Sequence, residues 1–317
     1  MLHVVFGAGQ IGSELARALA ARGHTVRVVR RSQAAVGEGI EVVAGDAMDP
    51  AFARRVTEGA AVVYHCMNPS AYTKEAWSSE FPKFGESLIQ AAVANDARLV
   101  VLDNLYAYGV VDGPRTEDTP RAATGPKGRV RIAWEERLRQ AAENDGLRFV
   151  AGRGGDFFGP GTSEQSLFSP AMVEGLRKGK SAWLIGASDA VHAFSFVPDV
   201  VEALVAFGEA GSDVEGEIFH LPVIEVAPAE LVERLAKAVG SNARSHTLPA
   251  WALTALAPIV PLFKNLQETL YQWDRPFRVS DAKLRARFPG LGSTLEEAVE
   301  VMSSTTPTRP VENQPSA

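Results

Sequence analysis

A glycine motif separates the first apolar run of the chain from its first helix-length segment. Leu2–Phe6 is an apolar run of strand length, residues 7–12 read GAGQIG, and residues 11–21 are rich in Ala and Leu. A G-x-G-x-x-G string alone is weak evidence, but a strand before it and a helix after it are the context that dinucleotide binding requires. This arrangement predicts the start of a parallel β-α-β unit that binds a dinucleotide.

Each residue of this motif has a physical reason to be where it is. Gly7 permits a tight turn, Gly9 lets the backbone approach a pyrophosphate, and Gly12 lets the helix pack closely on the strand. The pyrophosphate would lie on exposed N–H groups at the positive end of the helix. A glycine-rich turn that binds nothing is the alternative, and the flanking elements argue against it. The cofactor-contacting residues expected here are Gly7, Gly9, Gln10, Ile11 and Gly12.

The end of the second apolar run, Thr25–Arg30, indicates which dinucleotide is bound. An NAD site usually places an acid there to accept the ribose hydroxyls. This chain instead places Arg30 and Arg31 there, and two guanidinium groups can pair with the 2′-phosphate of NADP. We therefore predict NADP(H) as the favoured cofactor, with NAD(H) possible if these arginines are merely solvated.

The rest of the chain alternates short apolar runs with helix-length segments. Strands are expected at 40–43, 61–65, 99–103 and 147–151, and helices at 77–94 and 130–143. The strands show no polar alternation, as expected when both faces are buried. The pattern predicts an α/β fold, a Rossmann-type doubly wound parallel sheet with a smaller C-terminal substrate-side α/β subdomain. We expect a dinucleotide-binding domain over 1–160, a substrate-side domain over 161–302 interleaved with the last Rossmann elements, and a disordered tail over 303–317.

Composition narrows the possible partners. The net charge is −6 and the pI about 5.6, so no general field attracts nucleic acid or an anionic membrane. Cys66 is the single cysteine, which rules out an intrachain disulfide and fits a reducing cytoplasm. Prolines interrupt the longest apolar stretch, 248–263, so no membrane span is expected. A soluble cytoplasmic protein with a small-molecule substrate is predicted.

Several further motifs, in order, make the chain similar to the extended short-chain dehydrogenase/reductases, the NAD-dependent epimerase/dehydratase group. These are GAGQIG at 7–12, GDAMD at 45–49, DNLYAYG at 103–109, GGDFFGPG at 154–161 and FVPDV at 196–200. The resemblance extends to about residue 302. It implies a Rossmann fold and nicotinamide chemistry, and a homodimer through helix-to-helix contacts as in that family.

The resemblance also implies roles for particular residues. Asp46 and Ala47 would meet the adenine, Met67 and Asn68 would lie along the cofactor, and Gly155 would belong to the loop that passes the nicotinamide. These expectations complete the predicted cofactor site.

The catalytic helix departs from the family's pattern. The family uses Ser, Tyr and Lys, with Tyr and Lys spaced Y-x-x-x-K so that they lie one turn apart on one face. Glu135 resembles the acid four residues past the family's Lys. That alignment places Arg131 at the Lys position, Lys127 at the Tyr position and Asn104 at the Ser position. The usual proton donor is therefore missing, as in atypical members of the superfamily.

Other side chains are candidates for the missing proton donor. If the chain stays extended past 103, then Asn104, Tyr106 and Tyr108 point to one side of the sheet edge where ligands bind. Asn104 could then bind a substrate carbonyl, and Tyr106 could act as a surrogate acid, although packing roles for both tyrosines are the alternative. Lys127 is a weaker candidate because nearby glycines and Pro126 suggest an exposed helix start. Arg131 is expected to keep the ribose-binding duty of the Lys, since it cannot easily release a proton.

Two other groups of residues are expected to be structural. His65 and Cys66 end the fourth strand without convergent partners, so no metal site is expected. The aromatic side chains of the C-terminal part are expected to be core more often than substrate pocket; they are Trp251, Phe263, Tyr271, Trp273 and Phe277. The sequence thus predicts an NADP(H)-dependent oxidoreductase or epimerase-like enzyme for a small carbonyl or hydroxyl compound. A non-catalytic NADP(H)-binding redox sensor is the alternative.

Overall fold

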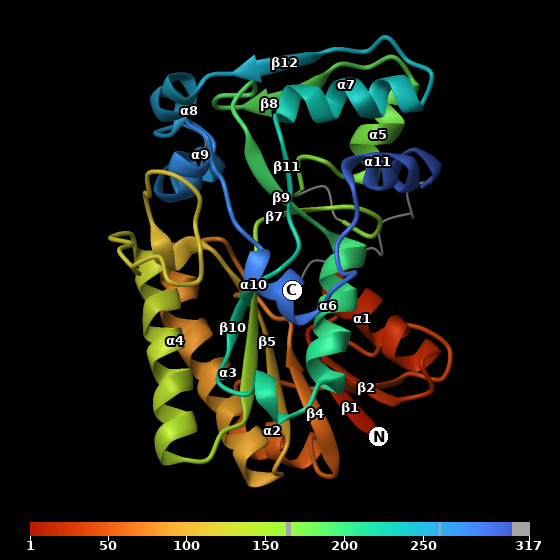
Figure 1. Cartoon of the computed structure of the whole chain (residues 1–317). Coiled ribbons are helices and arrows are strands. Elements are labelled where there is room, and N and C mark those ends of the chain that lie inside the picture. The colour runs from red at the N-terminus through yellow and green to blue at the C-terminus, as the bar shows by residue number, and fades with distance from the viewer. Residues whose placement is uncertain (163–165, 260, 306–317) are drawn as a thin grey trace.

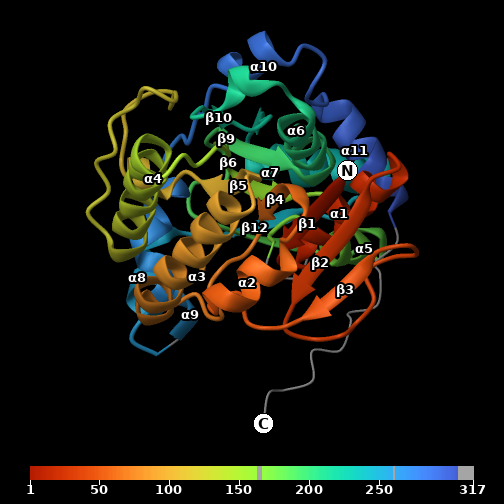
Figure 2. The same ribbon diagram turned by 90° about the horizontal axis from the view of Figure 1, so that it is seen from below.

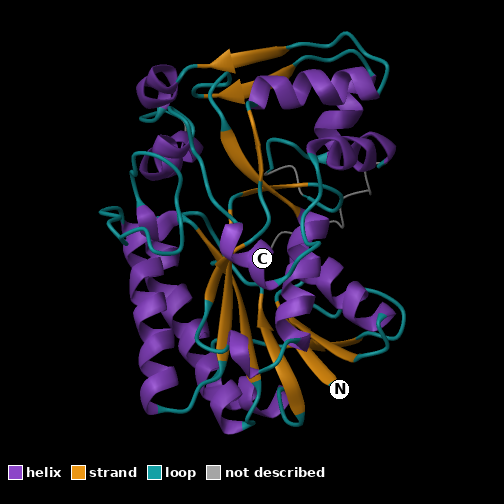
Figure 3. Cartoon of the chain, in the orientation of Figure 1, coloured by secondary structure: helices purple, strands orange, loops and turns teal. Residues whose placement is uncertain are grey.

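A seven-stranded parallel sheet forms the centre of the computed structural model, which describes residues 1–162, 166–259 and 261–305. The strand order is β10-β6-β5-β4-β1-β2-β3, with every neighbouring pair parallel (Figures 1 and 3). The predicted Rossmann-type α/β fold is therefore confirmed. The strands are β1 (Leu2–Phe6), β2 (Thr25–Arg30), β3 (Glu41–Ala44), β4 (Ala60–His65), β5 (Arg98–Asn104), β6 (Phe149–Gly154) and β10 (Ile218–His220).

Helices cover both faces of this sheet, as a doubly wound fold requires (Figure 2). Side chains of α2 (Pro50–Val56), α3 (Lys74–Ala94) and α4 (Pro126–Asn144) share one core with Val4 and Phe6 of β1. Those of α1 (Gln10–Ala21) and α6 (Val197–Glu209) share the other core with Val5. Successive strand residues point to opposite faces, and both faces here are apolar, which explains the strands without polar alternation.

The short helix α2 was not predicted, although its start has a clear local cause. The Asp49 side chain accepts hydrogen bonds from the N–H groups of Ala51 and Phe52, and Pro50 occupies the first helical position. An N-cap Asp followed by Pro is a standard helix start. The helix has only seven residues, too few to show an apolar period.

A second layer with its own core lies beyond the carboxyl ends of the large sheet (upper part of Figure 1). It holds a three-stranded sheet and a two-stranded one. The elements are β7 (Asp156–Phe158), β9 (His192–Phe196), β11 (Ile224–Val226), β8 (Ala182–Ile185), β12 (Ser245–Leu248), α5 (Pro170–Arg177), α7 (Pro228–Ala238) and α11 (Leu295–Ser304). Helix α11 includes the first two residues of the segment expected to be a tail, and residues 306–317 lie outside the described part.

The remaining elements are short. Residues 261–272 form α9 followed by a 3₁₀ turn, η3. Among the described residues no helix combines the length and apolar character needed to cross a membrane. The short elements are η1 (Tyr106–Tyr108), η2 (Ser212–Val214), α8 (Ala250–Leu256), α9 (Pro261–Leu266), η3 (Gln267–Gln272) and α10 (Ala282–Arg287).

Candidate dinucleotide and proton-transfer site

The glycine motif lies where the strand order of the sheet reverses. From β1 the chain adds β2 and β3 on one side and β4 onward on the other, and ligands of open α/β sheets bind at such a switch point. Gly7 has φ +99°, and a Cβ there would lie 2.7 Å from the Cys66 carbonyl oxygen. A Cβ on Gly12 would lie 1.9 Å from the Gly7 carbonyl oxygen. Both positions therefore require glycine, for the reasons expected from the sequence.

The N-terminus of α1 is open at Gly9. This residue is the N-cap, no side chain caps the helix there, and the first turn holds no acid. Among the described residues, no atom lies within 4 Å of a Cβ built on Gly9. These residues therefore leave the positive end of the helix dipole uncovered at a position without a side chain, which fits a pyrophosphate. Gln10 and Ile11 form the first turn.

The other predicted cofactor residues follow the ends of neighbouring strands. Arg30 ends β2 and donates from Nη1 to the Ala34 carbonyl at 3.1 Å, and Arg31 is exposed. Asp46 follows β3, with Ala47 next to it, and accepts from the Met48 N–H at 2.9 Å. These residues lie past the carboxyl ends of adjacent parallel strands, which is the edge expected for a dinucleotide.

Residues after β4 and β6 lie at the same edge. Met67 contacts the Gly7 turn, since a Cβ on Gly7 would lie 2.9 Å from its Cγ. Asn68 accepts through Oδ1 from Nη2 of Arg131 at 3.3 Å. The Gly155 N–H donates to Oγ of Ser195 at 3.0 Å, and a Cβ on Gly155 would lie 2.5 Å from the Ala193 carbonyl oxygen. The predicted set is therefore gathered along one edge of the sheet.

The expectation that Asn104, Tyr106 and Tyr108 share one face is wrong. β5 ends at Asn104, whose Oδ1 accepts from the Tyr106 N–H at 3.1 Å and turns the chain into η1. Such a local side-chain bond competes with a continued strand. The Tyr108 hydroxyl is consequently directed elsewhere, 2.7 Å from Nε2 of His220 and 3.0 Å from Nη1 of Arg153. Tyr108 is a fully buried structural residue.

The Tyr106 hydroxyl instead meets a second phenol. The Tyr72 hydroxyl, from the loop after β4, donates to that of Tyr106 at 3.0 Å and lies 3.4 Å from Oγ1 of Thr269. Burial raises the pKa of Tyr106 well above its usual value, and Tyr72 adds to this. Burial also raises the pKa of Tyr72, but the hydrogen bonds with Thr269 and Tyr106 act against it. Two protonated phenols thus meet near the carboxyl end of β5.

Lys127 is not at an exposed helix start, contrary to expectation; it is 2% exposed. Its Nζ donates to the Asn265 carbonyl at 2.8 Å, lies 3.6 Å from Oε2 of Glu268, and stands 4.1 Å from the centroid of the Tyr72 ring. Burial lowers its pKa, and Glu268 opposes this. The covering residues lie about 140 positions further along the chain, which is why local sequence did not reveal them.

Arg131 lies one helical turn further along α4 and is also buried. Its Nη1 is 2.9 Å from Oδ1 of Asp103, and its guanidinium lies 4.2 Å from the centroid of Phe81. Burial lowers its pKa while Asp103 raises it; an arginine still remains charged. Through Asn68 it contacts the loop after β4. The motif resemblance had not assigned any role to Asp103, the last residue before Asn104.

A buried ion network continues behind Arg131. Asp103 also pairs with Arg153 at 3.1 Å, and Arg153 pairs with Glu135 at 2.6 Å. Glu135 further binds Arg121 at 2.8 Å. Burial alone would raise the pKa of Glu135, but Arg121 and Arg153 lower it to about 2. Glu135, the residue on which the alignment of this helix with the family rests, is therefore a fully paired structural carboxylate.

A second polar pair near the tyrosines was missed from the sequence. Asp156 Oδ2 lies 2.8 Å from Nε2 of His192, whose ring stacks on Trp273 at 4.2 Å between centroids. The Asp156 carboxylate is close enough to raise the pKa of both Tyr72 and Tyr106. Its position within the glycine-rich segment 154–161 was the available signal. Trp273 thus lines this region, Phe277 is core, and Trp251 is 73% exposed.

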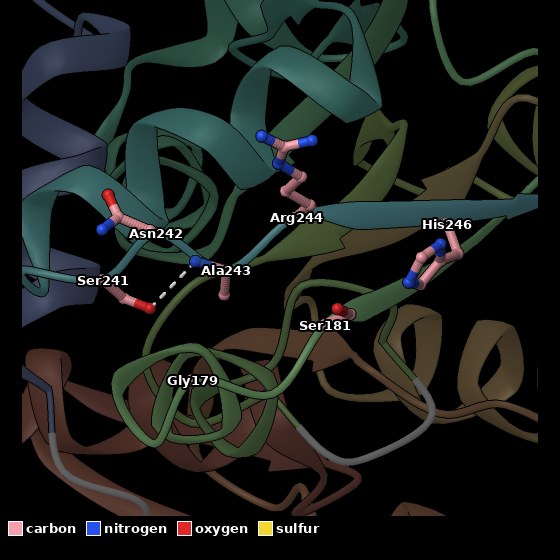
Figure 4. A pocket seen from close by; sticks show the side chains of 7 residues that line it. All are labelled: Gly179, Ser181, Ser241, Asn242, Ala243, Arg244 and His246. Carbon is pink, nitrogen blue, oxygen red and sulfur yellow. Dashed lines mark hydrogen bonds between the residues drawn. The ribbon is translucent and has the colours of Figure 1, made fainter.

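Two other features carry no site. His65 is buried among aromatic rings, and burial together with Arg131 lowers its pKa to about 3; over the described ranges no three potential ligands gather around a metal position. A hollow at the amino ends of β8 and β12 is lined by Arg244 and His246, but their side chains point away from one another (Figure 4). It is far from the glycine motif and has no convergent charge.

The fold and glycine cradle define a protein that binds a nicotinamide dinucleotide on a Rossmann sheet. The chain belongs to the NAD dependent epimerase/dehydratase family, whose sequence profile matches residues 3–221. The resemblance to extended short-chain dehydrogenases and the prediction of an oxidoreductase or epimerase/dehydratase-like enzyme are thereby confirmed at family level.

Individual relatives are distant. Mouse sterol-4-alpha-carboxylate 3-dehydrogenase, decarboxylating, is 24% identical over 286 residues, covering 85% of this chain and 77% of the relative. The 3beta-hydroxysteroid-dehydrogenase/decarboxylase isoform 2 of Arabidopsis thaliana is 23% identical over 241 residues. The match covers 70% of this chain but only 42% of that protein.

Solved structures support the fold. The UDP-glucuronic acid 4-epimerase of Bacillus cereus in complex with NAD superposes with a TM-score of 0.76 at 16% identity, covering 96% of this chain and 97% of the epimerase. A dTDP-glucose 4,6-dehydratase from Streptomyces venezuelae with NAD bound gives 0.75 at 20% identity, with coverages of 96% and 95%. The smaller layer is therefore part of the shared architecture.

Proposed function

We propose that this protein is an NADP(H)-dependent oxidoreductase acting on a small carbonyl or hydroxyl compound. The observation that carries the proposal is the meeting of Tyr72 and Tyr106 at the carboxyl edge of the sheet that holds the glycine cradle. A bound nicotinamide supplies or accepts the hydride, so the protein needs mainly to orient it and provide a proton. The phenol pair is a proton source where Y-x-x-x-K is missing.

Arg30 and Arg31 support the choice of NADP(H) over NAD(H). They follow β2, where a dinucleotide presents its adenosine ribose, and residues 30–37 contain no acid. Arg31 is exposed, so its guanidinium can pair with a 2′-phosphate without disturbing the core. Arg131 and Asn68, in contact at the same edge, would hold the nicotinamide ribose.

Calorimetric titration with NADP⁺, NADPH, NAD⁺ and NADH tests this specificity. We expect both NADP forms to bind tightly and both NAD forms weakly. The Arg30→Ala/Arg31→Ala variant should lose roughly a hundredfold in NADPH affinity, as expected for two charge-assisted contacts, and stay within about threefold for NADH. Arg22→Ala, an exposed arginine paired with Glu202, is the control. Equal losses for NADPH and NADH would refute the assignment.

The surroundings of the phenol pair favour a weakly polar substrate. Trp77 packs on both tyrosines, with ring centroids 6.0 Å from Tyr72 and 5.8 Å from Tyr106, and Trp273 lies beyond Asp156 and His192. Aromatic side chains beside the proton donor suit apolar carbonyl compounds better than sugar nucleotides. A screen should compare steroid-like ketones with sugar nucleotides while NADPH consumption is followed. Turnover of sugar nucleotides alone would contradict this part of the proposal.

The redox-sensor alternative has one observation in its favour, which is that Lys127 occupies the position of the usual tyrosine and binds the C-terminal segment instead. A ligand shifts a conformational equilibrium only through differential affinity. A strong preference for either NADP⁺ or NADPH in the same titration, without turnover of any compound in the screen, would favour the sensor.

A further inference from the structure

Tyr72 occupies a position where three elements meet. It lies in the loop after β4, and its hydroxyl contacts Tyr106 of η1 and Thr269 of η3. The Nζ atom of Lys127, on α4, stands 4.1 Å from the centroid of its ring. A phenol hydrogen-bonded at its oxygen and faced by an ammonium has the two components that proton donation by tyrosine requires.

Lys127 is held rigidly in that position. Its Nζ donates to the Asn265 carbonyl at 2.8 Å and lies 3.6 Å from the Glu268 carboxylate, and the side chain is buried. The ammonium therefore has little freedom to move away from the Tyr72 ring. In a buried setting a positive charge acts on a neighbouring phenol far more strongly than it would in water.

The geometry points to Tyr72 and Lys127 as a relocated Tyr–Lys pair that donates the proton, assembled across two elements rather than on one helix. This assignment deepens the proposed function and rests on it. As a substrate carbonyl carbon takes up hydride, the Tyr72 O–H bond breaks and an O–H bond forms on the substrate oxygen. The carbonyl becomes an alcohol, and Tyr72 is left as a phenolate that Lys127 stabilises.

Tyr106 is the less suitable donor of the two. Burial, Tyr72 and Asp156 all raise its pKa, and Arg131 alone opposes them. For Tyr72, burial, Asp156 and Glu268 raise the pKa, while Thr269 and Tyr106 lower it. Tyr72 thus has two hydrogen-bonding neighbours that can stabilise its phenolate.

A spectroscopic titration tests the pair without any substrate. Phenolate absorbance is followed against pH in the full-length protein and in Tyr72→Phe, Tyr106→Phe, Lys127→Met and Lys127→Arg. The difference between wild type and each Phe variant isolates one of the five tyrosines. We expect the Tyr72 phenolate to form at lower pH than that of Tyr106. Lys127→Met should shift it upward by about one pH unit, the effect of losing one nearby charge, and Lys127→Arg should restore it.

Kinetics provide the second readout once a substrate is known. Tyr72→Phe should slow single-turnover hydride transfer by at least about a hundredfold, the usual contribution of a general acid, with NADPH affinity unchanged within about twofold. Tyr106→Phe should cost about tenfold or less. A larger loss in Tyr106→Phe, or an unmoved Tyr72 titration in Lys127→Met, would overturn the pair. Failure of wild type to bind any dinucleotide would instead refute the proposed function itself.

Discussion

Two helices of this protein begin in the same way and end up in opposite situations. α1 has Gly9 and α4 has Gly125 as N-cap, and neither helix has a capping side chain of its own or an acid in its first turn. Within the described part of the chain, a Cβ on Gly9 would meet no atom within 4 Å, whereas one on Gly125 would lie 2.4 Å from the Glu268 side chain. The described residues thus leave the N-terminus of α1 uncovered and place a carboxylate at that of α4.

The carboxylate that fills it comes from the far end of the chain. Oε1 of Glu268 accepts from the N–H groups of Lys127 at 2.6 Å and Gly128 at 3.2 Å. It thus takes the position that an external anion would prefer at a helix N-terminus. The two ends of the site therefore differ, because the glycine motif lies at the N-terminus of α1 while the N-terminus of α4 is bound to the C-terminal segment.

The largest expected effect follows from placing a carboxylate at the N-terminus of α1, as Glu268 does at the N-terminus of α4. Gly9→Asp places a carboxylate where the pyrophosphate would lie, at a cost of about 4 kcal/mol at close range, or roughly a thousandfold in dinucleotide affinity. Thermal stability should hold, because Asp is a favoured N-cap. Gly9→Ala adds a methyl group but no charge and should lose less. Calorimetry and thermal melting measure both, and wild-type affinity in Gly9→Asp would show that the dinucleotide does not use this helix.

The next effect concerns Glu135 of α4 and the arginines that pair with it. The pKa of Glu135 is lowered to about 2 from 4.5. Because the folded pKa is depressed, the stabilisation is present above pH 4.5 and is lost as the pH falls toward 2, by about 3 kcal/mol in all. Glu135→Gln should be less stable at neutral pH and show a flatter decline in that window.

Urea denaturation at a series of pH values measures this effect. Glu136→Gln, an exposed neighbour on the same helix, should keep the wild-type slope. If Glu135→Gln and wild type lose stability in parallel below pH 4.5, the network does not hold Glu135 ionised.

The smallest effect comes from removing the Glu268 carboxylate from the N-terminus of α4. Glu268→Ala removes the acceptor for two backbone N–H groups and the carboxylate beside Lys127, and should destabilise the fold by about 2 kcal/mol. Glu268→Gln keeps an acceptor oxygen and should lose about half of that. Dinucleotide affinity should stay within about twofold in both, since α1 is untouched. If Glu268→Ala weakened dinucleotide binding by as much free energy as it destabilised the fold, the N-termini of α1 and α4 would be coupled.

Sequence reasoning succeeded where the cause of a structure is local. The glycine turn follows from the backbone needs of Gly7 and Gly12, and β1 and β2 have the bounds that their apolar runs predicted. Family, sheet and glycine cradle could therefore be read from short stretches of chain.

Prediction from sequence failed mainly where a segment distant in the chain determines the burial or contacts of a residue. Lys127 was expected to be exposed because its neighbours are Gly and Pro, yet Asn265 and Glu268 cover it. A local cause was missed as well, because the Asn104 side chain accepts a hydrogen bond from the Tyr106 N–H where β5 ends. The meeting of Tyr72 and Tyr106 likewise joins loops 34 residues apart, which no spacing rule predicts.

The contact between Lys127 and Asn265 also sets an order of assembly during synthesis. The strands around the glycine motif, β1 to β4, are complete by residue 65, whereas Asn265 follows Lys127 by 138 residues. At roughly 5–20 residues per second, a ribosome needs on the order of 7 to 30 seconds to bridge that interval. A nascent chain would thus carry the glycine motif well before the lysine beside Tyr72 is fixed in place.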